Sequence, residues 1–148
     1  MTIITYPSAT ELGTEYTVTP VPTDETDAII IKPASVDSSS VADVGGNTQG
    51  TLFINFTKGS LTKVTIKTYG SYKNNPGASD WYQEVIEKDD ATTLGKVTLG
   101  KQYIELDAST KIAYHFPLGA FKSFKVTVQG TGTASNSSLT LNAALKVN

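Results

Sequence analysis

The last ten residues, Leu139–Asn148, read LTLNAALKVN. Apolar residues occupy every second position from Leu139 to Val147, and the positions between them are mostly polar. Such alternation is typical of a β-strand with one buried face and one face in water, because successive side chains point to opposite sides of a strand. The C-terminal stretch therefore predicts an amphipathic strand.

Shorter stretches with strand character recur along the chain, separated by residues that favour turns. The expected strands are Ala28–Ile31, Leu52–Phe56, Leu61–Tyr69, Trp81–Glu87, Val97–Leu106, Lys111–Phe116 and Phe124–Val128. Residues 57–60 (TKGS) predict a hairpin between the second and third of these strands, with Gly59 available for a positive φ. Residues 130–138 predict a loop between the last two antiparallel strands. Many short strands at near-regular spacing predict an all-β fold, an antiparallel, jelly-roll-like β-sandwich.

The N-terminal part differs in composition. Residues 6–22 contain Pro7, Pro20 and Pro22, and proline disrupts a central strand because it has no N–H to donate. This stretch predicts an extended arm or an edge strand. We therefore expect an extended N-terminal arm over residues 1–26 and the β-sandwich domain over residues 27–148.

Composition bounds the function. A chain of 148 residues fits one domain that can bury a sizeable core. It has no cysteine, which excludes disulfides and thiolate metal sites. All 12 basic residues are lysines, scattered along an acidic chain with net charge -2. Because arginine is the usual reader of guanine and a preferred phosphate clamp, this pattern argues against a nucleic-acid partner.

The sequence also argues against a membrane partner. No apolar run approaches the roughly 20 residues that span a bilayer. The first ten residues lack the basic and apolar regions of a secretory signal, so we expect synthesis in the cytoplasm.

Catalytic and metal-binding groups are sparse. His115 is the one histidine, and its parity places it on the opposite strand face from Tyr114 and Phe116, as a surface residue. The carboxylate pairs Asp80/Glu84 and Glu105/Asp107 share strand parity, which is the arrangement that a glycosidase would need and also that of an ordinary solvated face. The acidic clusters at Asp24, Glu25 and Asp27 and at Asp89 and Asp90 lack the spacing of a calcium loop. We expect no enzyme activity, no cofactor and no bound metal.

Aromatic residues gather around one Pro- and Gly-containing loop, at Tyr69, Tyr72, Trp81 and Tyr82. Such a group can stack a sugar ring, anchor a protein interface or pack in the core. Trp81 and Tyr82 are neighbours on an expected strand, so their side chains point to opposite faces and at most one belongs to the core. The exposed one of the two is a candidate interface residue.

Two segments carry a resemblance to a known class of proteins. Residues 51–87 (TLFINFTKGSLTKVTIKTYGSYKNNPGASDWYQEVIE) and residues 121–147 (FKSFKVTVQGTGTASNSSLTLNAALKV) resemble small β-sandwich structural proteins of tailed-bacteriophage virions, in particular capsid decoration or cement proteins. The resemblance implies a non-enzymatic homo-oligomer, most commonly a trimer, that is made in the host cytoplasm. It also implies a place on the outside of the virion capsid, where the protein binds the major capsid protein and stabilises the shell.

The N-terminal residues and the aromatic group together give the candidate protein interface. Its members are Tyr6, Leu12, Tyr16, Val18, Val21, Tyr72, Trp81 and Tyr82. The alternative function is a carbohydrate-binding or host-attachment module of a head or tail fibre, in which the aromatic group around Tyr72 and Trp81 would bind the sugar.

Overall fold

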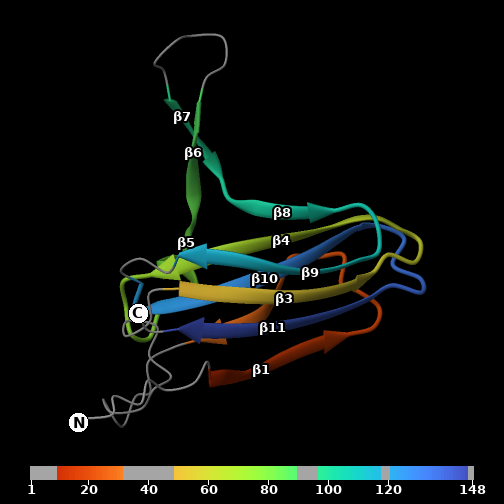
Figure 1. Cartoon of the computed structure of the whole chain (residues 1–148), viewed down its shortest axis with the longest axis horizontal. Coiled ribbons are helices and arrows are strands. Elements are labelled where there is room, and N and C mark those ends of the chain that lie inside the picture. The colour runs from red at the N-terminus through yellow and green to blue at the C-terminus, as the bar shows by residue number, and fades with distance from the viewer. Residues whose placement is uncertain (1–9, 32–48, 90–96, 118–120, 147–148) are drawn as a thin grey trace, which may run out of the picture.

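The computed structural model describes residues 10–31, 49–89, 97–117 and 121–146, and these are almost entirely β-strand (Figure 1). One 3-10 turn, Ala78–Asp80, lies among them. The strands are β1 (Thr10–Val18), β2 (Thr26–Ile31), β3 (Gln49–Thr57), β4 (Leu61–Ser71), β5 (Tyr82–Gln83), β6 (Val85–Asp89), β7 (Val97–Lys101), β8 (Tyr103–Leu106), β9 (Thr110–Pro117), β10 (Ser123–Gly132) and β11 (Ser138–Lys146).

Two antiparallel sheets pack face to face and confirm the expected β-sandwich. Sheet A has the strand order β1-β11-β3-β9. Sheet B has the order β2-β10-β4-β5, and β8 also pairs with β4. Counting β5 and β8 as one edge strand, the order of the two four-stranded sheets is that of a jelly roll.

The predicted hairpin at residues 57–60 is wrong. β3 lies in sheet A and β4 in sheet B, so Lys58, Gly59 and Ser60 cross from one sheet to the other. The connection from β10 to β11 crosses in the same way, and the Ser60 N–H donates to the Ser135 carbonyl at 2.9 Å, which joins the two crossings. Gly59 does have the expected positive φ, at 57°. Alternation predicts which face of a strand is buried, but it does not identify the strand's neighbour.

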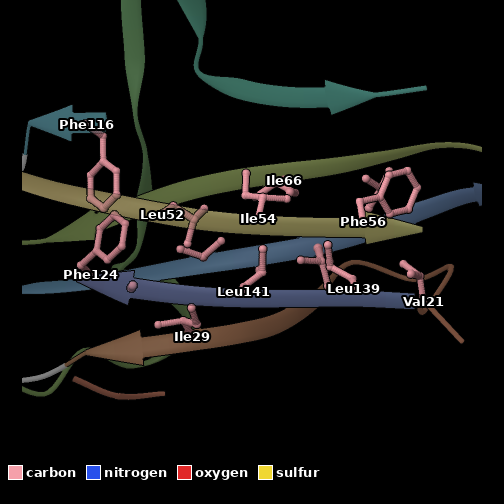
Figure 2. Close-up of a cluster of buried hydrophobic side chains, with 14 of the residues drawn as sticks. Val21, Ile29, Leu52, Ile54, Phe56, Ile66, Phe116, Phe124, Leu139 and Leu141 are labelled. Atoms are coloured by element: carbon pink, nitrogen blue, oxygen red, sulfur yellow. The ribbon is translucent and has the colours of Figure 1, made fainter. Parts of the chain in front are cut away.

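The core lies between the sheets and consists of the inward-facing apolar residues (Figure 2). The C-terminal alternation is confirmed, because Leu139, Leu141 and Ala143 are buried. At one end of the core the rings of Phe116 from sheet A and Phe124 from sheet B stack, with centroids 4.9 Å apart. This stack holds the ends of β9 and β10 together across the two sheets.

Residues 10–26 belong to the sandwich. β1 is an edge strand that pairs with β11 from Thr10 to Val18. Val21 follows it and is buried in the core, where its N–H donates to Ser137 Oγ at 3.0 Å. Of the two expectations for this stretch, the edge strand is confirmed from Thr10 onward and the extended arm is corrected. The sandwich therefore includes residues 10–26, which the predicted boundary at residue 27 left out, and residues 1–9 of the predicted arm lie outside the described residues.

Candidate protein interface

The outer edge of sheet B is built by two strands placed one after the other along β4. β5 pairs with the end of β4 at Tyr69 and Gly70, and β8 pairs with Val64–Lys67. Between them the Glu84 N–H donates to the Thr68 carbonyl at 3.1 Å. The two strands thus act as one edge strand with an interruption after Glu84.

At this interruption the chain leaves the sheet and returns. β6 and β7 pair with each other and form a two-stranded ribbon that projects away from both sheets (Figure 1). The Gln102 N–H donates to the Glu84 carbonyl at 2.7 Å and closes the base of the ribbon. The predicted strands over residues 81–87 and 97–106 are therefore each divided, with one part in sheet B and the other in the ribbon.

The register of the edge strand continues across the ribbon. Gly70 lies opposite Tyr82 and Lys67 lies opposite Tyr103, so three steps along β4 correspond to 21 steps along the chain. The excess of 18 equals the number of residues in 85–102. Because 18 is even, β8 has the same inward and outward alternation that an uninterrupted β5 would have.

A polar cluster lies at the base of the ribbon, between the two sheets. Glu84 lies opposite the buried residue Thr68, and burial raises the pKa of its carboxyl, an effect that the Thr68 hydroxyl partly opposes. Gln102 is buried, and its Nε2 donates to the Tyr114 hydroxyl at 3.0 Å. Burial, followed by the charge of Glu84, raises the pKa of Tyr114. The cluster ties the base of the ribbon to β9 of sheet A.

Beside the base of the ribbon lies an apolar pocket, which we call the tyrosine surface. It has a volume of about 360 Å³ and is lined by Gly70, Ser71, Tyr72, Tyr82 and Phe121. The two tyrosines are 64% and 59% exposed, and their ring centroids are 6.1 Å apart. A Cβ atom on Gly70 would collide with the ring of Phe121, so only glycine permits this approach. Both tyrosines were predicted interface residues, and the structure brings them together.

The Trp81 side chain points to the opposite face from that of its neighbour Tyr82, and it lies over the outer face of sheet B. Lys125 Nζ is 5.1 Å from the Trp81 ring and 5.1 Å from the Tyr69 ring, and it pairs with Asp27 at 3.1 Å. Trp81 is only partly exposed. Of the predicted pair, Tyr82 is therefore the exposed member, and neither of the two is part of the core.

The same outer face holds a carboxylate with several partners. The Tyr69 hydroxyl donates to Glu25 Oε1 at 2.5 Å, and the Thr127 hydroxyl donates to the same oxygen at 2.8 Å. Burial raises the pKa of Tyr69 to about 12, together with the hydrogen bond and charge of Glu25. Burial alone would raise the pKa of Glu25, but the two hydrogen bonds and the nearby lysines outweigh it and lower the pKa.

The N-terminal members of the predicted interface lie elsewhere. Tyr16 and Val18 pack partly buried against the core from β1, and Val21 is fully buried, so the prediction of Val21 as an interface residue is wrong. Pro20 and Pro22 suggested an arm, yet the single apolar residue between them reaches the core. Leu12 lies in β1, in a part where the side chains are not described, and Tyr6 lies outside the described residues.

Sequence reasoning missed four residues of this region: Phe121 in the tyrosine surface, Val85 and Leu99 in the ribbon, and Tyr103 in β8. Eight large hydrophobic side chains of the described residues are exposed, and five of them lie between residues 72 and 103. Strand character is uninterrupted over residues 81–87 and 97–106, so the sequence pattern did not distinguish the ribbon strands from the edge strands that they continue. The turn-forming residues between these two stretches are its one signal in the sequence.

The remaining polar candidates are dispersed. His115 is exposed, as predicted, and its Nδ1 lies 2.8 Å from the Thr51 hydroxyl. Asp80 lies in the 3-10 turn rather than in a strand, so it does not share a strand face with Glu84 as expected; the Gly77 N–H and then Lys73 lower the pKa of its carboxyl. Glu105 pairs with Lys63 at 2.8 Å.

Within the described ranges, no three acidic or histidine side chains gather as metal ligands. The part of the chain that the structure describes also contains no helix with the length and hydropathy needed to cross a bilayer. Neither the scan against protein-family models nor the search of curated proteins gives a match for this chain.

Proposed function

We propose that this protein is a structural protein of a bacteriophage virion, a decoration protein that binds the major capsid protein on the outside of the capsid and stabilises the shell. The resemblance of residues 51–87 and 121–147 to decoration proteins provides the class of assembly. The tyrosine surface provides a physical means of attachment. The proposed role is binding alone and includes no catalytic step.

The observation that carries the proposal is the pocket between Tyr72 and Tyr82. Tyr72 and Tyr82 are both exposed by more than half, and they lie beside an apolar pocket of about 360 Å³. Exposed apolar surface that gathers in one place is a mark of interaction sites. Tyrosine suits an interface since its ring buries a large area at low entropic cost while its hydroxyl can keep a hydrogen bond. The pocket can receive one apolar side chain of the capsid protein.

The fold is compatible with this role. Jelly rolls serve in virus shells and also in lectins, so the fold narrows the function less than the surface does. A decoration protein meets its partner many times on one particle, and copies that also contact each other gain avidity from simultaneous binding. A modest interface at the tyrosine surface is therefore sufficient for stable attachment.

Cosedimentation with undecorated phage capsids tests the proposal. We expect the wild type to saturate the capsids at a stoichiometry set by capsid symmetry. The double variant Tyr72→Ala/Tyr82→Ala should lose this binding, because tyrosine is enriched among interface hot spots, whose truncation costs about 2 kcal/mol or more. Phe53→Ala is the matched control, since Phe53 is also exposed, at 48%, but lies on the outer face of sheet A. A wild-type protein that ignores capsids, or a double variant that binds like the control, would refute the proposal.

One observation favours the alternative function, a glycan-binding module. A groove of about 330 Å³ on sheet B is lined by Lys63, Thr65, Lys67, Tyr103, Glu105, Gln129 and Thr131. Tyr103 is 50% exposed and offers a ring for stacking, and its neighbours offer hydrogen-bond donors and acceptors for hydroxyl groups. A glycan array in which a definite sugar signal disappears with Tyr103→Ala, but survives in Tyr82→Ala, would support this function over capsid decoration.

A further inference from the structure

The β6–β7 ribbon has two open edges. Within the described residues, β6 and β7 pair with each other and with no other strand. The outer edge of each strand therefore presents backbone N–H and C=O groups that no described strand pairs. Such an edge is a template for strand addition from another chain.

The two edges differ in how they are protected. β6 contains three successive charged residues, Glu87, Lys88 and Asp89. β7 reads VTLGK and has one charge, at its last residue, Lys101. Natural proteins use charged residues on edge strands to prevent pairing with other chains. The β6 edge thus carries this protection, whereas the β7 edge, with β-forming Val97, Thr98 and Leu99, lacks it.

We propose that β7 pairs antiparallel with β7 of a second copy of this chain, about a two-fold axis at Leu99. This register places Leu99 opposite Leu99 of the second copy, and Val97 opposite Lys101, so no two like charges face each other. The corresponding pairing of β6 with itself about Glu87 or Lys88 would place like charges opposite each other. The charge pattern thus favours self-pairing of β7 over self-pairing of β6 along its full length, because an isologous contact needs a self-complementary edge.

Exposure and strand number support this contact. Leu99 is 71% exposed, which is the highest value among the large hydrophobic side chains that the structure describes. Val85 lies on the same face of the ribbon and is 53% exposed. A two-stranded ribbon alone is marginally stable in water, and three or more strands are needed for independent stability. Pairing of two ribbons gives the four-stranded order β6-β7-β7-β6. The ribbon stands clear of both sheets, which leaves the β7 edge accessible (Figure 1).

The contact is independent of capsid binding, and it predicts a two-fold dimer rather than the trimer that the family resemblance implies. Light scattering of the purified full chain measures the molar mass and therefore the number of copies in the oligomer. The monomer is 15.7 kDa, so we expect a mass of twice this value. Leu99→Lys should return the protein to the monomer mass because it places two ammonium groups opposite each other. Ile112→Lys is the control, since Ile112 is 38% exposed on β9 of sheet A.

Single cysteine variants locate the axis without depending on loss of association. The chain has no cysteine of its own, and residues directly opposite each other in an antiparallel pair can bring two sulfur atoms within disulfide range. Under mild oxidation, Leu99→Cys should form a covalent dimer on a non-reducing gel much faster than Val85→Cys, which lies on the same ribbon but in β6. A monomeric or trimeric wild type, a dimer that survives Leu99→Lys, or equal cross-linking of the two variants would overturn the proposal.

Discussion

Removal of residues 85–102 should leave a folded sandwich. Since the register of the edge strand continues across the ribbon, this 18-residue deletion joins Glu84 to Tyr103 and produces one continuous edge strand along β4. None of the apolar core residues that the structure describes is lost. The main loss is the hydrogen bond from Gln102 to Tyr114, which is worth about 1 kcal/mol. We expect the free energy of unfolding to stay within about 1 kcal/mol of the wild-type value.

A deletion of residues 85–103 is the matched comparison, because it removes one residue more. The following strand then joins the edge out of phase, which turns Ile104 and Leu106 outward and Glu105 inward. Both apolar residues are partly buried against the core. Fully burying such a side chain is worth roughly 1.5–3 kcal/mol, and each of these two is only partly buried. Losing about half of that value at each residue lowers the free energy of unfolding by about 2 kcal/mol in total. For a chain of this size that corresponds to a melting temperature lower by roughly 4–8 °C.

Thermal unfolding followed by circular dichroism measures this difference, and urea titration supplies the free energies. The wild type and the 18-residue deletion should have similar stabilities, and the 19-residue deletion should be the least stable of the three. A wholly unfolded 18-residue deletion, or one less stable than the 19-residue deletion, would refute the assignment of β5 and β8 to one interrupted strand.

Three further changes test other parts of the structure. Phe124→Ala should lower the free energy of unfolding by about 3–5 kcal/mol, because it removes a fully buried ring that stacks across the sheets. Phe53→Ala, on an exposed face, should lower it by less than about 1 kcal/mol. Urea unfolding of both variants measures the difference. Gly59→Ala should cost at least about 1–2 kcal/mol, because φ is positive and the new Cβ would meet the backbone of Asn136; a neutral effect on melting would show that the crossing is not so tightly packed. Folding raises the pKa of the Glu84 carboxyl above its usual 4.5, so the folded state is stabilised while this carboxyl is protonated. That stabilisation is lost as the pH rises through the folded-state pKa. Glu84→Gln should therefore melt higher than wild type at pH 7, with a difference that shrinks below about pH 4, and an unchanged or lower melting temperature at neutral pH would contradict this.

Alternation in the sequence was sufficient to predict the faces of most strands. Leu139, Leu141 and Ala143 point inward, as their spacing indicates, and Phe124 and Val126 do the same on β10. The pattern could not predict pairing, because a residue that faces the core has the same sequence signature whichever neighbour its strand has. A short turn-like connection at residues 57–60 therefore looked like a hairpin, although it crosses between sheets.

The candidate site was predictable only in part. The grouping of aromatic residues around one loop was sufficient to nominate Tyr72 and Tyr82 as interface candidates, but it left open whether Trp81 or Tyr82 is exposed, and the structure shows that Tyr82 is. The ribbon was not predictable, because strand character continues without a break over residues 81–87 and 97–106 and no residue type marks the division at Glu84 and Gln102. The arm prediction failed at Val21 for a related reason: proline excludes a central strand, but it does not keep an adjacent valine out of the core.

The attachment of the ribbon has a consequence for its length. The register of β8 is set by its pairing with β4, and the base of the ribbon is closed by Glu84 and Gln102, so sheet B is independent of how far the ribbon extends. One residue added to each ribbon strand lengthens it by about 3.3 Å. The ribbon is therefore an adjustable spacer: its reach can change to suit the distance to a neighbouring molecule while the jelly roll that carries it stays the same.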